Sequence, residues 1–384
     1  MPTSNRAIKY RIYPTSQQES LIRQTFGCVR KVYNKALQMQ TALYKAGVKH
    51  LSAFQLNTIC TREWKEEYPY LRDVDKFALT QSLLSLERGF QSFFAKRTGY
   101  PKFKSKRQGK QSYTTAFTNN NIQVGEGFVR LPKLGRVPAV IHRQPGSNWE
   151  IKQATVSKTA SGRYYVSVLF EFEANIPDRT IDTVNALGLD YDNPLLYVDS
   201  NGQSPDHPRA FFCSKERLAK EQRQLSRMTP GSKNYEKQRF RVAKVHEHIA
   251  NQRKDFLHKL SRKIANSCDI VSVEDVDLRV IASSESVLAL GVWTHDNGFG
   301  MLRTLLQYKL EEQGKIFVKV SREYPSTRIC NACGDLREEV GLAEKKWVCS
   351  TCGALILRDH NAAKNIRDEG VRIYLESLLS AAEQ

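Results

Sequence analysis

The chain has 384 residues, a length that predicts roughly two to four domains. It carries 59 Lys and Arg against 40 Asp and Glu, a formal net charge of +19, which favours polyanionic partners because each neutralised phosphate releases counterions. The sequence contains no long apolar run and no signal peptide, so we expect a cytoplasmic protein that binds nucleic acid rather than a membrane protein.

The first 96 residues predict one strand followed by three helices. Apolar residues alternate with Lys9 and Arg11 over residues 8–12, which indicates a half-buried strand with a basic outer face. The sequence SQQE, residues 16–19, has the spacing of a capping box and opens the first helix. Apolar periodicity predicts two further helices, over 53–64 and 75–96.

A strongly basic segment follows these helices. Seven of the fifteen residues in KRTGYPKFKSKRQGK, residues 96–110, are Lys or Arg, and Tyr100 and Phe103 lie between them. A solvated loop and a segment that follows phosphates and stacks on bases explain this composition equally well. The candidate nucleic-acid contacts here are Lys102, Lys104, Lys106 and Arg107.

The next part of the chain is rich in strands. Short strand patterns separated by Gly and Pro run from about residue 112 to residue 173, and they indicate a small barrel or sandwich. The isolated first strand needs a sheet to join. We therefore assign residues 1–14 and 112–178 to one β-barrel, with residues 15–111 as a helical domain inserted in it.

Beyond a linker over residues 175–183, strands and helices are mixed. The run ALGLDYD ends on acids, and its apolar pattern resumes after Pro194 as in a hairpin. The elements expected after this hairpin are helices over 214–228 and 233–266, a buried strand in CDIVSVEDVDL, a helix over 300–313 and a strand in KIFVKVS.

Four of the eight cysteines are clustered. Cys330 and Cys333 form one CxxC pair, Cys349 and Cys352 form another, and fifteen residues separate the two pairs. Two such pairs supply the four thiolates of a tetrahedral zinc site. Four thiolates leave no open coordination position, so we expect one structural Zn²⁺ rather than a catalytic one.

Three carboxylates lie at corresponding places in the pattern. Asp190 ends the first strand of the hairpin, Glu274 ends a later strand, and Asp359 lies just before a helix. Each of them alone fits a cap or a turn. Their order is that of an RNase H-like fold, in which three carboxylates hold two divalent ions about 4 Å apart. Hard oxygen ligands of this kind suit Mg²⁺.

These motifs resemble those of a known family. GLDYDNPLLYVDSNG, NQRKDFLHKLSRKI, VEDVDL, STRICNACG with WVCSTCG, and RDHNAAKNI resemble the RuvC nuclease half of TnpB proteins. TnpB proteins are transposon-encoded, RNA-guided DNA endonucleases related to CRISPR type V effectors. KYRIYPT, DVDKFAL, GYPKFKSKR and FTNNNIQVGEG are similar to the N-terminal half of the same family, so the resemblance covers nearly the whole chain.

The resemblance implies a multidomain α+β protein. It implies a wedge-type β-barrel with an inserted helical recognition domain, then an RNase H-like (RuvC) domain over 182–325 and 354–384 with a zinc ribbon over 326–353 inserted in it. It also implies a transposon-derived guide RNA (omega RNA), double-stranded target DNA, a monomer in the complex, and cleavage of both strands at one site. Asp190, Glu274 and Asp359 would be the catalytic residues and would bind two Mg²⁺.

The resemblance also implies contacts to the duplex beside the target, at Lys76, Phe77, Thr118 and Asn119. The chain departs from many relatives at two places near the carboxylates. Asp192 stands where many relatives have Gly, and Leu357 stands where many have Asp, which leaves Asp359 as the only candidate in its motif.

Three alternative functions fit parts of the sequence. A strand transferase would share the RNase H-like fold, but it requires recognition of transposon ends, for which the sequence gives no sign. A nuclease-inactive, RNA-guided DNA-binding repressor should lack at least one carboxylate, and all three are present. A zinc-containing RNA-binding protein would leave the order of the acids unexplained.

Overall fold

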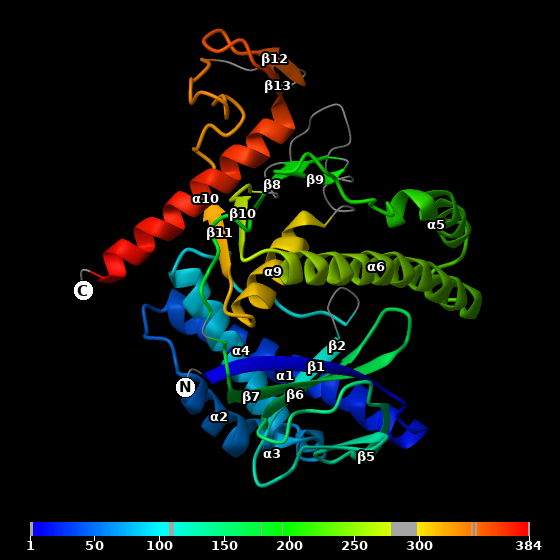
Figure 1. The fold of residues 1–384 in the computed structure, drawn as a ribbon. Helices are drawn as coiled ribbons and strands as arrows, with labels where there is room; N and C mark the ends of the chain where they lie inside the picture. Colours follow the sequence, from blue (N-terminus) through cyan, green and yellow to red (C-terminus); the bar gives the residue numbers. More distant parts are fainter. Residues whose placement is uncertain are drawn as a thin grey trace. The chain divides into compact units, whose positions relative to one another are not determined.

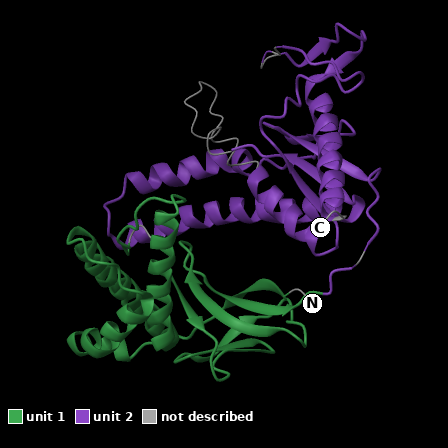
Figure 2. Cartoon of the chain, turned by 90° about the vertical axis from the view of Figure 1, so that its left-hand side faces the viewer, with its two compact units in different colours: residues 1–174 green, residues 175–384 purple. Residues whose placement is uncertain are grey.

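The chain divides into two units, residues 1–174 and residues 175–384 (Figure 2). The computed structural model describes residues 3–106, 111–177, 179–193, 195–277, 298–338, 341 and 344–382. Within these ranges, no helix is long and apolar enough to cross a membrane.

The first unit is built on a seven-stranded sheet (Figure 1). Its strands are β1 (Thr3–Ile12), β2 (Gln111–Ala116), β3 (Gln123–Gly125), β4 (Phe128–Leu131), β5 (Gly135–Val140), β6 (Glu150–Lys158) and β7 (Tyr164–Glu173). They lie in the order β2-β6-β7-β1-β5-β4-β3, so the N-terminal strand pairs antiparallel with β7 and β5. The sheet curls into a half-barrel with β2 and β3 at its two edges. The sequence predicts a barrel for this part of the chain.

Helices cover this sheet and enclose the core of the unit. They are α1 (Ser16–Lys45), α2 (Ala53–Ile59), a π-helical turn (Cys60–Trp64), α3 (Lys65–Glu67), a 3₁₀ turn (Pro69–Arg72) and α4 (Lys76–Phe94). Tyr10 of β1, Phe26 of α1 and Leu83 of α4 are buried in one cluster. The helix predicted over 53–64 is divided, because the chain continues from α2 into a π-turn that buries both of its end residues.

The first helix begins one residue earlier than the predicted capping box. Thr15, not Ser16, is the N-cap, and its hydroxyl accepts a bond from the Gln18 N–H at 3.3 Å. Both TSQQ and SQQE have the required spacing, so spacing alone does not select between them. The Gln18 amide also donates to the carbonyls of Leu134 and Arg136, and these tertiary bonds favour the observed register.

The second unit contains a four-stranded sheet in the order β11-β10-β8-β9. Its elements are β8 (Ala186–Asp192), β9 (Leu196–Asp199), α5 (Ala210–Ser226), α6 (Lys233–Ser267), β10 (Ile270–Glu274), α9 (Phe299–Glu311), β11 (Ile316–Val320), β12 (Lys346–Val348), β13 (Leu355–Leu357) and α10 (Arg358–Ala382). β8, β10 and β11 are parallel, and β9 returns antiparallel beside β8, which confirms the predicted hairpin.

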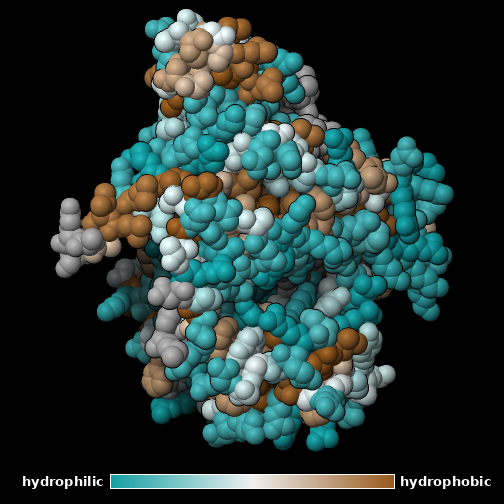
Figure 3. Space-filling view, viewed as in Figure 1, coloured by the Kyte–Doolittle hydropathy of each residue, from teal (hydrophilic) through white to brown (hydrophobic). Residues whose placement is uncertain are grey.

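The surface of this unit is polar over α5 and α6 and over much of the rest, with apolar residues in local patches (Figure 3). Exposed apolar side chains gather at the C-terminal end of α10 and on the ribbon formed by β12 and β13. They include Leu375, Leu378, Leu379, Val348, Leu355 and Leu357. The charged helices are therefore the part of the unit most like a polyanion-binding surface.

The two faces of the four-stranded sheet have different partners. Leu187 and Leu189 of β8 pack into the core formed with α6 and α9. Because side chains alternate along a strand, Gly188 and Asp190 point to the opposite face, which α10 crosses. A Cβ added at Gly188 would lie 2.0 Å from the carbonyl oxygen of Ala363 in α10, so backbone meets backbone at this crossing.

We predict that Gly188→Ala strongly destabilises the second unit. Its methyl group would also lie 2.6 Å from the Arg367 nitrogen, and rigid backbone atoms cannot yield as a side chain does. The free energy of unfolding should fall by about 3 kcal/mol, the upper part of the range for overpacked cores. A lower unfolding temperature would report this loss. Gly27→Ala is the matched control, because that helical glycine has open space around its Cβ position and should be neutral or stabilising. Equal melting of Gly188→Ala and the wild type would contradict this packing.

Candidate metal centres and nucleic-acid contacts

Two of the predicted carboxylates lie at the same edge of the four-stranded sheet. In the parallel pair of β8 and β10, Leu189 is opposite Val273, so Asp190 and Glu274 are the next residues of their strands. Both also follow the alternation onto the face that α10 covers, as Ser272 of β10 does against Gly370. Parallel pairing therefore brings two acids far apart in sequence to neighbouring positions.

The environment of Asp190 disfavours its negative charge. The side chain is 7% exposed, and burial raises its pKa well above the ordinary value. The nearby charges of Glu274, Asp359 and Asp192 raise this pKa further, while Arg358 lowers it. Burial also raises the pKa of Glu274. All three predicted carboxylates are thus close enough to interact electrostatically, which makes this edge of the sheet the candidate site for divalent cations.

Asp359 is brought to this site by the start of α10. It is the second residue of the helix, and its carboxylate accepts a bond from the Arg358 guanidinium at 2.8 Å. Arg358 is a residue of the site that our sequence analysis did not identify. The sequence signal for it is the basic residue directly before the acid in the LRD motif.

Asp192 has a different role from its neighbour Asp190. Its carboxylate accepts a bond from the Leu195 N–H at 2.9 Å, across the turn that joins β8 to β9. This contact is that of a turn-forming aspartate. The extra acid therefore shapes the hairpin while adding negative charge near Asp190.

A cavity of about 570 Å³ opens at the carboxyl ends of β10 and β11, next to Glu274. Arg303 and Arg322 line it together with Asp275. The Arg303 guanidinium donates to the Asp275 carboxylate at 2.8 Å, which holds it at the rim of the sheet.

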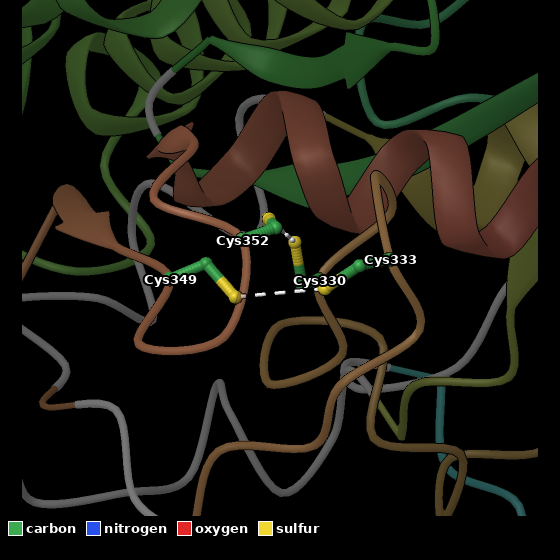
Figure 4. Close-up of side chains that lie close together, drawn as sticks. All are labelled: Cys330, Cys333, Cys349 and Cys352. Carbon is green, nitrogen blue, oxygen red and sulfur yellow. Dashed lines mark hydrogen bonds between the residues drawn. The ribbon is translucent and has the colours of Figure 1, made fainter.

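The four clustered cysteines come together as predicted (Figure 4). All four sulfur atoms lie within 4.8 Å of one another, with 3.7 Å between Cys330 and Cys352 and 3.6 Å between Cys333 and Cys349. Four sulfurs around one zinc ion at about 2.3 Å would be about 3.8 Å apart, so this arrangement fits Zn²⁺. Within the described ranges, it is the only group of three or more such side chains gathered this tightly.

The two halves of the cysteine cluster have the same backbone structure. In the first half, the Cys330 N–H donates to the Asp335 carbonyl and the Gly334 N–H donates to the Cys330 carbonyl, both at 2.8 Å. The second half repeats both bonds around Cys349, at 2.9 Å. Gly334 and Gly353 have φ values of +80° and +70°, which glycine adopts readily. The glycine after each CxxC pair therefore allows the tight turn that presents two sulfurs.

Hydrogen bonds also prepare one sulfur for metal binding. Backbone N–H groups of Cys352 and Thr351 lower the pKa of the Cys349 thiol to about 7, although burial opposes this shift. Although backbone hydrogen bonds act to lower the pKa of Cys333 and Cys352 too, burial and the neighbouring sulfurs raise both instead. The case for zinc therefore rests on the geometry of the four sulfurs. The remaining cysteines are dispersed: Cys28, Cys60 and Cys268 are buried, and Cys213 is exposed.

Candidate duplex contacts lie on two neighbouring segments of the first unit. Lys76 is the first residue of α4, and its ammonium lies 5.0 Å from the centre of the Phe77 ring. The buried Asp75 carboxylate caps this helix through the Phe77 N–H at 3.1 Å and also accepts a bond from the Thr115 hydroxyl of β2. Thr118 follows closely after β2, so the Asp75 side chain ties the two candidate segments together.

The second segment is a tight turn of asparagines. Asn119 and Asn120 have φ values of +47° and +58°, in the left-handed region that Asn tolerates better than most residues. The Asn121 side chain stabilises the turn by accepting a bond from the Thr118 N–H at 2.8 Å and donating to the Ala116 carbonyl at 3.1 Å. Asn119 is exposed on this stabilised turn.

The basic segment has members in different environments. Lys102, Lys104 and Lys106 are all exposed, but Lys104 has contacts that restrain it. Two hydrogen bonds, of 2.8 and 2.9 Å, join the backbone of Lys104 to the Asn34 side chain. The Lys104 ammonium lies 3.7 Å from the centre of the Tyr33 ring. Desolvation lowers the pKa of Lys104. Arg107 lies outside the described residues.

Three regions of the chain match models of known families. Residues 167–284 match a model described as "Probable transposase", residues 1–49 one described as "Helix-turn-helix domain", and residues 299–366 one described as "Cas12f1-like, TNB domain". In the structure, the described residues of the first 49 form β1, α1 and the start of the following loop.

Curated proteins resemble the chain over nearly its whole length. One is "Putative RNA-guided DNA endonuclease" of Streptomyces pristinaespiralis, 36% identical over 97% of this chain and 90% of that protein. Another is "Putative RNA-guided DNA endonuclease InsQ" of Escherichia coli K12, 30% identical over 95% and 92%. The fold resembles that in a cryo-EM structure of a Cas12f1–sgRNA–target DNA complex, with a TM-score of 0.60 at 13% identity, covering 95% of this chain and 99% of that one.

We predict that the folded chain holds about one zinc ion and that Cys352→Ser removes it. The loss of one thiolate should unfold the ribbon, because structural zinc sites contribute folding energy directly. Zinc content by elemental analysis and protease sensitivity near residue 350 measure the two effects. Cys213→Ser, which replaces an exposed thiol outside the cluster, is the control and should keep its zinc. A folded wild-type chain without zinc would refute the assignment.

Proposed function

Because this chain belongs to the TnpB family, we propose that it is an RNA-guided, Mg²⁺-dependent endonuclease that cuts both strands of its target DNA at one active site. The guide would be an RNA derived from the transposon, and the second unit would be the RuvC-like nuclease. The observation that carries the proposal is that Asp190 is buried on a parallel sheet next to Glu274, and close enough to Asp359 of α10 for the two charges to interact.

The three carboxylates fit the binding of divalent cations. Their oxygen atoms are the hard ligands that Mg²⁺ prefers, and their mutual repulsion is an energetic cost that cations would offset. Bound divalent ions would activate a water molecule and stabilise the leaving oxygen at the scissile phosphate. We assign Asp190, Glu274 and Asp359 as the ligands that would hold these ions.

The other residues of the site would prepare it for a phosphodiester. The close approach of α10 to β8 at Gly188 would restrict movement of Asp359 relative to Asp190, so little reorganisation would be needed during the reaction. The Arg358 guanidinium orients the Asp359 carboxylate. The neighbouring cavity is lined by two arginines and three acids, and Arg303 is paired with Asp275, so we assign its rim no role in attracting the DNA strand.

Recognition of the target would be divided between the RNA and the protein. Base pairing with the guide would read the sequence, and the protein would read only a short motif in the flanking duplex. We assign this second task to Lys76, Phe77, Thr118 and Asn119, on the segments that the Asp75 side chain joins. Lys102, Lys104, Lys106 and Arg107 would contact phosphates, with Lys104 the least free to do so.

We predict that Asp190→Ala abolishes cutting of both strands while guided binding to the target changes by less than a few-fold. Binding energy should come mainly from guide pairing and backbone contacts, whereas Asp190 acts only at the scissile phosphate. Gel shift and cleavage with Mg²⁺, each with the same guide RNA, separate the two properties. Asp192→Ala is the matched control and should leave most cutting intact, since Asp192 shapes a turn.

The outcomes of this experiment are distinct. Normal cutting by Asp190→Ala would refute the nuclease site. Inactivity of Asp192→Ala alone would shift the catalytic position by two residues. Guided binding by the wild type without any cutting would instead favour an RNA-guided repressor.

We also predict that Lys76→Ala or Thr118→Val changes the flanking motif that the protein accepts. Groove contacts discriminate between bases by about 1–3 kcal/mol for a good bidentate pair, and loss of one contact should relax one position of the motif. Cleavage of a library with randomised flanking sequence measures this preference. Lys102→Ala is the comparison, since a phosphate contact should lower activity evenly for all motifs. An unchanged motif in the first two variants would remove them from base recognition.

A further inference from the structure

Helix α10 lies between two partners on opposite sides. With about 100° of rotation per residue, Asp359, Ala363 and Gly370 fall on one side of the helix. Ala363 and Gly370 of this side meet the four-stranded sheet. Asn361 and Asn365 fall on the opposite side, and both are buried, at 5% and 3% exposed. Helix α10, which carries Asp359, is therefore buried on two opposite sides.

Asn361 binds the ribbon as a neighbouring strand would. Its amide donates to the Ile329 carbonyl at 2.6 Å, and its side-chain oxygen accepts the Asn331 N–H at 2.9 Å. These two backbone groups flank Cys330, the first of the clustered cysteines. Asn361 is also only two residues from Asp359. One side chain thus connects the backbone around a metal ligand to the first turn of α10.

Asn365 repeats this connection one helical turn later. Its amide donates to the carbonyls of Ser326 and Ile329, at 2.7 and 2.8 Å. Its side-chain oxygen accepts a bond from the Asn331 amide at 2.9 Å, and the same Asn331 amide donates to Asp368 at 2.8 Å. The contact surface between helix and ribbon is therefore built from directional hydrogen bonds, which fix position more narrowly than apolar packing does.

We propose that Asn361 and Asn365 are positioning residues of the nuclease site. They transmit the folded state of the zinc ribbon to Asp359, so that the affinity of the carboxylates for divalent cations depends on the ribbon. This proposal rests on the proposed function, because it takes Asp359 as one of the cation ligands. The closed set of four thiolates would then act on the reaction without any contact with substrate or catalytic ions.

The alternative is that the asparagines only attach the ribbon. In that case their loss would affect zinc retention or stability, and the carboxylates would bind cations as before. A positioning role makes a different prediction, because partners that orient ligands change metal affinity by roughly 10–100-fold when they are lost. The dependence on Mg²⁺ concentration therefore separates the two roles, whereas a loss of total activity would not.

The test uses the full-length chain with Asn361→Ala and Asn331→Ala, which remove the same contact surface from the helix side and from the ribbon side. We expect both variants to keep about one zinc ion per chain. Both should require roughly tenfold more Mg²⁺ for half-maximal cleavage. They should also show weaker Mn²⁺ binding by electron paramagnetic resonance, a readout that is independent of cleavage. Ser380→Ala, on the exposed far end of α10, is the control and should match the wild type.

Wild-type Mg²⁺ dependence and Mn²⁺ binding in a zinc-loaded Asn331→Ala would overturn the proposal. If the variants fail to fold, the wild-type chain stripped of zinc and then titrated with Mn²⁺ gives the same test. Unchanged Mn²⁺ affinity there would overturn it, and weakened affinity would support it. Asp359→Asn distinguishes this proposal from the proposed function. Normal cutting by Asp359→Asn would refute the nuclease site itself, whereas an inactive Asp359→Asn beside an unaffected Asn331→Ala would refute only the positioning role.

Discussion

Helix α10 approaches strands β8 and β10 so closely that its contacts at Gly188 and Gly370 are made partly by backbone atoms. A side chain larger than hydrogen at either position would prevent this close approach. Because the contacts involve rigid backbone atoms, α10 has little freedom to slide across the sheet. The crossing determines where the first turn of α10 lies relative to Asp190. The second unit can therefore hold groups from a first strand, a later strand and a late helix in one arrangement, although no local sequence feature joins them.

This arrangement has an electrostatic cost that the rest of the unit must offset. Asp190 is buried next to other acids, and both effects oppose its ionisation. Arg358 offsets part of that repulsion from within the same turn as Asp359. If these acids bind cations as proposed, stability and function are opposed at this point of the fold. The clustered cysteines likewise gather groups that would repel one another as anions, but with softer sulfur ligands and a closed geometry.

Much of this organisation was predictable because it is recorded in short patterns. Alternation predicted β1, an apolar run that ends on acids predicted β8, and the spacing of the two CxxC pairs predicted the cysteine cluster. The exact helix start at Thr15 was not predictable, because its selection depends on carbonyls more than a hundred residues away. The contacts of Asn361 and Asn365 in α10 were not predictable either. Buried amides have no periodicity of their own, and only the three-dimensional neighbours of Asn361 and Asn365 show what they bind.

The glycine crossing also has a consequence for how the protein is made. Strand β8 leaves the ribosome long before α10, and the intervening residues must be synthesised before Gly188 meets Ala363. Contacts of such large sequence separation form slowly and late. The first unit is continuous in sequence up to residue 174, so all of it would be synthesised before the second unit begins. The three acids would thus come together only when translation is nearly complete, so a stalled or truncated chain would lack the assembled group of acids.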